Sequence, residues 1–442
     1  MLRSLTRGVF GVALRVFFRR VEIVGEEQVP RSGPVMFVMN HPNALIDPGI
    51  LLCLAPRPVA FLAKAPLFKT PVLGFIVSAF DSIPIHRRQD EGGQVDNSQT
   101  FAAARKLLQR GQAMAIFPEG VSHNDPRLKP LKTGAARIAL GTGLADLTIV
   151  PVGISYGEKA KFRSEALLLY GEPFVWPAVA LDEHGEPPAA AVQALTRRIE
   201  AALKTVTLQV DEATAVALVD RVGRIFAASS EAPWTLAEML DLRRRISAGY
   251  EKLRSEDPQA LAAVEAKVTR YERDLSALGM TPEHLKPADF TLWGSVRYAL
   301  RSAAALGLLL PLALVGTALH YPCYRLTRLL ARRFSEGSED MVATIKVLAA
   351  TLFFPLTWIA SGVLVGYSAG WMFGVLAGVL APLCGAAALY FWERFVTVGA
   401  AARGLLLFAT RRNALARLDA DRAAIRAAIL ALAARVEGPA GP

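Results

Sequence analysis

The chain has 442 residues, of which 52% are hydrophobic, and it carries a formal net charge of +11 with a mean hydropathy of +0.32. This length accommodates more than one domain, and the apolar excess, concentrated late in the chain, predicts a soluble part joined to a membrane part. The positive charge indicates an anionic partner, either phospholipid headgroups or a phosphorylated substrate; nucleic acid is not expected, since no finger, helix-turn-helix or aromatic-studded basic sheet is recognisable.

Residues 1–22 are expected to form a basic amphipathic helix. In MLRSLTRGVFGVALRVFFRR, arginines spread over half of a helical wheel opposite leucine, valine and phenylalanine (Arg3, Arg7, Arg15, Arg19). Arg15 interrupts the apolar run and no small-residue cleavage site follows, so a signal peptide is not predicted. Two interpretations stay open: an interfacial helix on anionic lipid, which we adopt, or a helix that packs on its own domain.

Residues 23–205 are predicted to form an α/β domain. Short apolar runs that end in turn residues are typical of buried strands: PVMFVMN, DSIPIHR, QAMAIFPEG, LTIVPVGISYG and EALLLYGEP. Between two of them, NSQTFAAARKLLQRG begins with capping-type residues and stops at Gly111, as a helix does. Alternation of strands and helices favours an α/β fold, in which sites gather at strand ends.

Residues 206–290 are predicted to be a solvated helical connector. The stretch is charged and helical in pattern, with Pro-rich segments near both boundaries, EHGEPPAA and MTPEHLKPADF. It contains no recognisable chemical motif.

Residues 291–395 are predicted to be a membrane region. Val347 to Trp392 contains no charged residue over 46 positions, enough for a transmembrane hairpin with helices at 347–367 and 371–392. Lys346 and Arg394 flank the run, so both of its ends are expected in the cytoplasm. Residues 396–442 are expected to form a C-terminal cytoplasmic helix.

The apolar stretch 302–319 is predicted to be re-entrant or interfacial. Pro311 lies in its middle, and arginines flank it on both sides (Arg297, Arg301, Arg325, Arg328, Arg332, Arg333). A full span here would place the N-terminal domain and the hairpin ends on opposite sides of the membrane.

The cysteines are few, odd in number and widely spaced (Cys53, Cys323, Cys384). This pattern predicts neither a disulfide framework nor a metal site. A reducing, cytosolic environment is therefore expected.

His41 and Asp47 lie in the turn NHPNALIDP, after an apolar run. Histidine is the usual general base near neutral pH, and a carboxylate on its other ring nitrogen would fix the tautomer and stabilise the imidazolium. No serine or cysteine nucleophile is adjacent, so the proton would come from a substrate hydroxyl or from water. From the stretch alone, a turn in which Asp47 caps a helix and His41 is merely buried is equally possible.

Two other strand ends carry polar groups. In FPEGVSH, Gly120 permits close approach of the backbone to a ligand, and Ser122 and His123 can bond to phosphate or hydroxyl groups. In IPIHRR, Arg87 and Arg88 offer the fork that suits a phosphate, although a solvated strand end is the commoner fate of such a pair. Further positive charge follows the FPEG turn at Lys129, Lys132 and Arg137.

The order of these blocks is more specific than any single block. NH(x5)D, IPIHRR, FPEG and Val150-Pro151-Val152-Gly153 follow one another as in the glycerophospholipid acyltransferase superfamily, which residues 20–180 resemble. The resemblance implies that His41 deprotonates the acceptor hydroxyl with support from Asp47, and that Arg87 binds the acceptor phosphate together with Glu119 and Gly120. It also implies that Pro151 shapes the acyl-donor side.

Two departures from the usual blocks point to one branch. Five residues separate His41 from Asp47 where the family usually has four, and FPEGTRS becomes FPEGVSH, so Ser122 replaces an arginine. Both changes, and the run FRSEALLLYGEP, resemble the branch that contains fungal-type glycerol-3-phosphate/dihydroxyacetone-phosphate acyltransferases. Arg88, His123 and Lys132 are candidates to supply the lost positive charge.

The expected function is that of an integral membrane O-acyltransferase of phospholipid biosynthesis. It would move a fatty acyl group from coenzyme A or acyl carrier protein to glycerol 3-phosphate or dihydroxyacetone phosphate by direct attack on the thioester, with no cofactor and no metal. The alternative acceptor is lysophosphatidate or another lysophospholipid. A channel or transporter is disfavoured by the charge-free hairpin, and a catalytically dead homologue by the intact His41, Asp47 and Glu119. The catalytic domain is expected on the cytoplasmic face of the inner or plasma membrane, in contact with membrane lipid.

Overall fold

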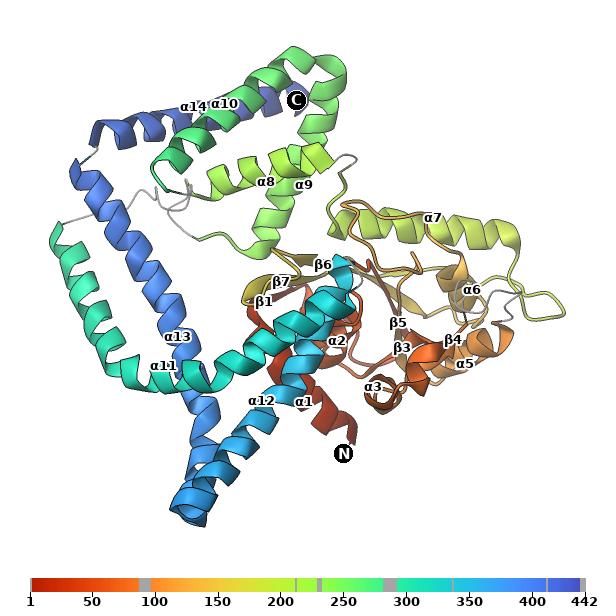
Figure 1. Cartoon of the computed structure of the whole chain (residues 1–442). Coiled ribbons are helices and arrows are strands. Elements are labelled where there is room, and N and C mark those ends of the chain that lie inside the picture. Colours follow the sequence, from red (N-terminus) through yellow and green to blue (C-terminus); the bar gives the residue numbers. More distant parts are fainter. Residues whose placement is uncertain are drawn as a thin grey trace. The chain divides into compact units, whose positions relative to one another are not determined.

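Figure 1 shows the chain in a computed structural model, which describes residues 2–86, 97–210, 213–228, 233–280, 292–335, 338–410 and 412–437. The chain forms two compact units. Unit 1 comprises Met1–Gln209 and Thr327–Thr351, and unit 2 comprises Val210–Leu326 and Leu352–Pro442. The N-terminal unit therefore contains a short piece of chain from the predicted membrane region.

Unit 1 is built on an eight-stranded sheet in the order β1-β7-β6-β2-β5-β3-β4, with β8 paired to β6. Its strands are β1 (Phe18–Val24), β2 (Val35–Met39), β3 (Val59–Lys64), β4 (Ile83–Ile85), β5 (Ala113–Ile116), β6 (Thr148–Tyr156), β7 (Ser164–Tyr170) and β8 (Phe174–Val175). The central strand β2 pairs in parallel with β5 and β6, whereas β6 and β7 are antiparallel. The predicted α/β fold is confirmed.

Helices cover both faces of this sheet (Figure 1). The helices are α1 (Leu2–Phe17), α2 (Ile46–Leu54), α3 (Pro71–Ala79), α5 (Ser98–Gln109), α6 (Gly134–Leu140) and α7 (Ala189–Val206), with 3-10 turns η1 (Glu26–Gln28) and η2 (Ala65–Lys69). Successive side chains of β2 point to opposite faces: Phe37 packs with residues of α1 and α2, and Met36 with residues of α5, α6 and α7. A strand buried on both faces explains the unbroken apolar run VMFVM.

Parallel pairing brings three strand ends together at one edge of the sheet. Strand β2 ends at Met39 just before His41, and its neighbour β5 ends at Ile116 just before the FPEG turn. On the other side of β2, Met39 pairs with Val152 of β6. The two motif loops therefore lie side by side, and the last residues of strand β6 lie next to them.

Helix α1 packs on its own domain. Phe10, Leu14 and Phe17 are buried in the core, and Arg7 donates hydrogen bonds to the carbonyl oxygens of Cys53 (2.9 Å) and Ala55 (3.0 Å). A second apolar stripe at helical spacing stays exposed (Leu5, Val9, Val12, Val16). Arg7 therefore bonds within the domain, while Arg15 and Arg19 are exposed. An interfacial position of this helix, with its exposed stripe in lipid, stays a prediction.

In unit 2, the predicted connector and the C-terminal helix share one core. The helices α8 (Ala213–Ala228), α9 (Leu236–Glu256), α10 (Pro258–Ala277) and α14 (Arg412–Glu437) belong to this unit. Val222 of α8, Val268 of α10 and Ile425 of α14 lie in one buried cluster. The stretch predicted as a solvated connector is thus part of a helical bundle that the last helix completes.

In the part of the chain that the structure describes, three helices are long and apolar enough to cross a membrane, over Leu300–Phe334, Glu339–Ala369 and Trp371–Gly399. They belong to α11 (Leu292–Phe334), α12 (Glu339–Ala369) and α13 (Trp371–Thr410). Gly370, with φ of 103°, makes the reversal between α12 and α13, at the position predicted for the hairpin turn. A Cβ on Gly374 would lie 2.6 Å from the carbonyl oxygen of Gly362, so glycines let these two helices pack closely.

Helix α11 runs without a reversal through Pro311. The predicted segment 302–319 therefore lies inside a longer helix and does not turn back on itself, which leaves a spanning or a surface-lying arrangement. Within unit 2, Gly316 fits against α13, where an added Cβ would lie 2.0 Å from the carbonyl oxygen of Cys384. Trp358 of α12 donates from Nε1 to His320 Nε2 at 2.8 Å.

Candidate active site

His41 and Asp47 face one another. His41 Nδ1 and Asp47 Oδ2 are 2.8 Å apart, with side-chain exposures of 11% and 0%. His41 follows β2, and Asp47 lies in the first turn of α2, where its Oδ2 also accepts the Asn43 N–H at 2.7 Å. The turn from His41 to Asp47, one residue longer than is usual in the family, includes Ala44 with a φ of +28°. Asp47 thus holds the turn before the helix and orients the imidazole. It does not cap the helix, whose N-cap is Leu45 with no side-chain cap hydrogen bond.

The far ring nitrogen of His41 is available for chemistry. With the Nδ1 proton donated to Asp47, Nε2 carries a lone pair, and it makes no hydrogen bond to any residue that the structure describes. The ring stacks on Phe117 with centroids 3.9 Å apart and an interplanar angle of 11°. Phe117 begins the FPEG block, so the aromatic residue of that motif fixes the plane of the imidazole.

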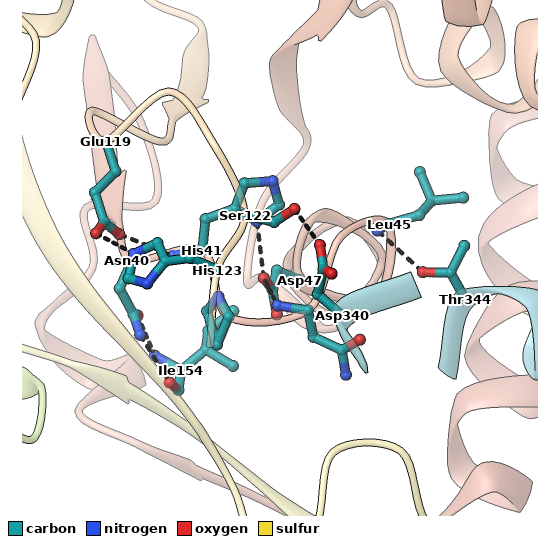
Figure 2. A network of polar contacts seen from close by, with 12 residues as sticks. Asn40, His41, Leu45, Asp47, Glu119, Ser122, His123, Ile154, Asp340 and Thr344 are labelled. Atoms are coloured by element: carbon teal, nitrogen blue, oxygen red, sulfur yellow. Dashed lines mark hydrogen bonds and ion pairs between the residues drawn. The ribbon is translucent and has the colours of Figure 1, made fainter. Parts of the chain in front are cut away.

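Two residues that the sequence analysis did not single out hold the dyad. Tyr156, at the end of β6, donates its hydroxyl to Asp47 Oδ1 at 2.6 Å, and burial, together with the charge of Asp47, raises the pKa of Tyr156 well above its usual range. Asn40 donates to the Ile154 carbonyl oxygen (3.0 Å) and accepts the Ile154 N–H (2.7 Å), as Figure 2 shows. Asn40 could have been found from the sequence, because it lies directly before His41. No sequence pattern marked Tyr156 as a site residue.

Glu119 is a clamp between the two motif loops. Its side chain is fully buried, Oε1 accepts the His41 N–H at 3.2 Å, and Oε2 accepts the Lys129 N–H at 2.7 Å. Oε2 also lies 2.5 Å from His123 Nε2, and the His123 N–H donates to the His41 carbonyl oxygen at 3.1 Å. Both oxygens contact protein groups, which fits a residue that organises the site. The part in phosphate binding that the resemblance implies for Glu119 stays a prediction.

Gly120 and Lys132 form a basic corner beside this clamp. Gly120 has φ of +74°, and a Cβ there would lie 2.7 Å from Lys132 Nζ. The missing side chain therefore lets the lysine lie across the turn, while the Lys132 N–H donates to the Pro118 carbonyl oxygen at 2.8 Å. The Lys132 side chain is exposed, and among the described residues its ammonium has no hydrogen-bond or ion-pair partner. It is placed to meet an anion.

Ser122 and His123 are engaged within the protein. Ser122 donates its hydroxyl to Asp340 Oδ2 at 2.5 Å, and His123 Nδ1 lies 3.7 Å from Asp125 Oδ2 while Nε2 faces Glu119. Neither side chain offers a free cationic group to a substrate. Of the two described candidates to replace the family's arginine, His123 and Lys132, the exposed Lys132 has the geometry that fits an anion; Arg88 lies outside the described residues.

The remaining predicted residues lie elsewhere. Arg87 and Arg88 fall outside the described residues, and the last described residue before them is His86, which follows β4. Pro151 is buried within β6, opposite Val38 of β2. Its place in the sheet fits a structural residue below the site, and a role on the acyl-donor side stays a prediction.

Lys159, from the loop between β6 and β7, is a further cation at the site. Its Nζ donates to the Pro42 carbonyl oxygen at 3.0 Å and to Asn124 Oδ1. Burial lowers the pKa of Lys159, although the nearby carboxylates of Asp340, Glu339 and Asp47 oppose the shift. Among described residues, no group of three His, Cys, Asp or Glu side chains is arranged to hold a metal ion.

Comparison with known proteins agrees with this geometry. The acyltransferase family matches residues 20–155, and the glycerol-3-phosphate acyltransferase 2 C-terminal domain matches residues 218–440, about half of the chain. The chain belongs to the glycerophospholipid acyltransferase superfamily, in the branch that contains the fungal-type glycerol-3-phosphate acyltransferases. It is accordingly an acyltransferase.

Its relatives differ in how much of the chain they match. An uncharacterized acyltransferase of Schizosaccharomyces pombe is 23% identical, over 94% of this chain and 78% of its own length. Glycerol-3-phosphate O-acyltransferase 1 of Saccharomyces cerevisiae is 25% identical, over 79% of this chain and 59% of its own length. The chloroplastic 1-acyl-sn-glycerol-3-phosphate acyltransferase BAT2 of Brassica napus is 33% identical, but over 35% of this chain and 43% of its own length.

Proposed function

We propose that this chain transfers a fatty acyl group from an acyl thioester, on coenzyme A or acyl carrier protein, to the hydroxyl of glycerol 3-phosphate. Dihydroxyacetone phosphate, which has the same phosphate and a free hydroxyl, is the related acceptor. The observation that carries the proposal is the His41–Asp47 pair, held at 2.8 Å with the second imidazole nitrogen unengaged. A histidine arranged in this way accepts a proton from a hydroxyl at neutral pH.

In the proposed reaction, His41 Nε2 takes the proton of the acceptor hydroxyl as its oxygen attacks the thioester carbonyl. The carbon–sulfur bond then breaks, and the imidazolium returns the proton to the departing thiolate. Asp47 stabilises the imidazolium between these steps, and Tyr156 keeps the Asp47 carboxylate in place through its hydroxyl. No acyl-enzyme is required, which suits a dyad whose hydrogen-bond partners include no serine or cysteine.

Lys132 supports a phosphorylated acceptor. Its ammonium lies across the Gly120 turn, in the loop that Glu119 ties to the backbone of His41. A cation there attracts a phosphate while the hydroxyl of the same small molecule approaches the base. Arg87 is proposed, from the resemblance, as a second phosphate ligand.

The extent of similarity favours glycerol 3-phosphate over lysophosphatidate as the acceptor. The yeast glycerol-3-phosphate acyltransferase matches 79% of this chain, whereas the plant 1-acylglycerol-3-phosphate enzyme matches about a third of it. The C-terminal half also matches the domain named after a glycerol-3-phosphate acyltransferase.

The residues that belong to unit 1 support a proposal for the membrane topology. Residues 327–351 pack with residues 1–209, and Ala343 and Val347 are buried in the shared core. Among the described residues before α11, no helix is long and apolar enough to span, and the longest gap, 281–291, is shorter than the roughly 20 residues that a span requires. If α11 crossed once, 327–351 would lie across the membrane from the domain they help to build. We therefore propose that α11 lies along the cytoplasmic face, and that α12 and α13 form the transmembrane hairpin.

The acceptor is tested with the purified full-length protein in detergent and labelled acyl-CoA, or acyl carrier protein, as donor. We expect glycerol 3-phosphate to give the highest kcat/KM, dihydroxyacetone phosphate to follow, and lysophosphatidate to be a poor acceptor. A preference for lysophosphatidate would replace the proposed acceptor with the alternative.

The topology is tested by labelling cysteines introduced at Arg297 and Arg328, which should react with an impermeant reagent from the same side of sealed vesicles. Labelling from opposite sides would show that α11 spans the membrane.

A further inference from the structure

The first turns of α12 pack against the loops that carry the candidate active site. Four described hydrogen bonds join them: the Leu45 N–H to Thr344 Oγ1 (3.2 Å), the Ser122 hydroxyl to Asp340 Oδ2 (2.5 Å), Asn124 Nδ2 to Glu339 Oε2 (3.4 Å), and Lys346 Nζ to the Ala160 carbonyl oxygen (2.6 Å). Figure 2 shows the first two of these contacts beside His41 and Asp47. All of these residues belong to unit 1.

Burial distinguishes this segment from a simple membrane anchor. Ala343 is 0% exposed and packs in the same cluster as Ile46 and Ile50 of α2. Asp340, at 7% exposed, is a buried carboxylate, and such a group is costly unless it is bonded. Its oxygens accept the hydroxyls of Ser122 and Ser338. The segment is therefore built into the domain through both apolar and polar contacts.

A short chain of bonds leads from Asp340 to the candidate base. Ser122 precedes His123, whose N–H donates to the His41 carbonyl oxygen at 3.1 Å. The ring of His123 contacts Glu119, and Glu119 accepts the His41 N–H at 3.2 Å. Both backbone polar groups of His41 are thus held by the loop that Asp340 holds.

We propose that Asp340 is a positioning residue for acyl transfer, and that the first turns of α12 complete the active site of the α/β domain. Asp340 acts through Ser122: it fixes the 117–123 loop, and that loop sets the position of the His41 imidazole. This inference rests on the proposed function, since it takes His41 as the base. It adds that a segment beyond the α/β domain in sequence is required for catalysis, so a protein ending near Gln209 would lack part of its active site.

The kinetic test compares four variants of the full-length protein: Asp340→Ala, Asp340→Asn, Ser122→Ala, and the double variant Asp340→Ala/Ser122→Ala. For Asp340→Ala we expect kcat to fall on the order of tenfold, because a small displacement of a catalytic group is costly, while KM for the acyl donor stays within about twofold. Asp340→Asn keeps an oxygen that accepts the Ser122 hydroxyl, so it should recover most of kcat. If Asp340 acts through Ser122, the double variant should be little worse than the worse single variant.

A matched control separates this effect from a general change in charge. Glu172 is an exposed acidic residue of the same unit, so Glu172→Gln removes one negative charge away from the site and should leave kcat unchanged. Hydrogen exchange gives a readout that does not depend on the substrate. Peptides covering 117–123 should exchange faster in Asp340→Ala than in the parent, and at the parent rate in Glu172→Gln.

Two results would overturn the inference. One is a kcat for Asp340→Ala within twofold of the parent; the other is independent, multiplying losses from Asp340→Ala and Ser122→Ala. If Asp340→Ala lowers the yield or the melting temperature but the folded fraction keeps its kcat, Asp340 is structural and the inference fails. Failure of the proposed function is recognised separately, because the parent itself would then not acylate glycerol 3-phosphate, while the exchange measurement would still test the link from Asp340 to the loop.

Discussion

Two histidine–carboxylate pairs lie side by side in this site, although they are far apart in sequence, and they are built for different tasks. In the first pair, His41 Nδ1 is 2.8 Å from Asp47, and in the second, His123 Nε2 is 2.5 Å from Glu119. Both carboxylates are fully buried. Composition and burial alone would therefore not tell the two apart.

The difference lies in the second ring nitrogen. Neither His41 Nε2 nor His123 Nδ1 has a described hydrogen-bond partner, but His123 Nδ1 is buried, with Asp125 Oδ2 3.7 Å away, whereas His41 Nε2 is not buried. The carboxylates differ in the same sense. Asp47 contacts the imidazole, a backbone N–H and Tyr156, while Glu119 accepts backbone N–H groups from both motif loops. A base needs one nitrogen held and the other open, so His41 fits catalysis and His123 fits support.

The largest effect is expected when the two histidines are exchanged for alanine one at a time. His41→Ala should lower kcat on the order of a thousandfold, the usual contribution of a general base, and His123→Ala roughly tenfold by loosening the loop. Steady-state assays in added imidazole check the assignment: a small base should restore part of the activity of His41→Ala and none of that of His123→Ala. Equal losses, or rescue of His123→Ala alone, would reverse the roles.

Asp47→Asn tests the carboxylate of the catalytic pair. The amide keeps the size of Asp47 but does not stabilise an imidazolium, and it can hold the ring in the wrong tautomer. We expect kcat to fall about a hundredfold or more with KM for both substrates nearly unchanged. The control is Asp125→Asn, because the Asp125 side chain is exposed and its contact with His123 is long, and surface pairs contribute little.

Glu119→Gln tests the other carboxylate, and here stability should change as well as rate. The variant places an amide where N–H groups from His41 and Lys129 converge, so one buried donor loses its acceptor. Such a loss costs about 1–3 kcal/mol of folding free energy, and we expect a lower melting temperature with a kcat reduced roughly tenfold. A variant as stable as the parent but inactive would instead assign Glu119 to the chemistry.

Much of the position of this site could be predicted from the sequence, and the physical reasons can be named. Apolar runs locate β2 and β5, and parallel neighbours put the ends of both strands at one edge, so the approach of the His41 and FPEG loops followed from the pattern. The role of Glu119 did not follow, because a motif does not show whether a carboxylate faces substrate or backbone. Tyr156 and Asp340 are 109 and 218 residues away in sequence from the residues they bind, Asp47 and Ser122. No local pattern records such long-range contacts.

The smallest effect is expected for Tyr156→Phe, which removes one hydrogen bond from the catalytic pair and leaves the supporting pair intact. Asp47 keeps its contacts with His41 and the Asn43 N–H, so kcat should fall only severalfold. The contribution of the Tyr156 hydroxyl should be clearer in the stability of the protein than in kcat. Burial raises the pKa of Tyr156 well above its usual range, so the folded protein holds this proton more tightly than the unfolded chain, and the stabilisation is complete below the unfolded pKa of about 10.

Stabilisation from the Tyr156 hydroxyl is therefore lost as the pH rises above about 10, where the unfolded chain ionises and the folded protein does not. Phenylalanine has no such proton, so the melting temperature of the parent should exceed that of Tyr156→Phe near neutral pH and approach it in alkali. Thermal unfolding of both proteins in detergent at about pH 8 and about pH 10.5 measures the gap at each pH. A gap that stays constant would mean that Tyr156 ionises equally in both states, and that its bond to Asp47 does not hold the dyad as the structure indicates.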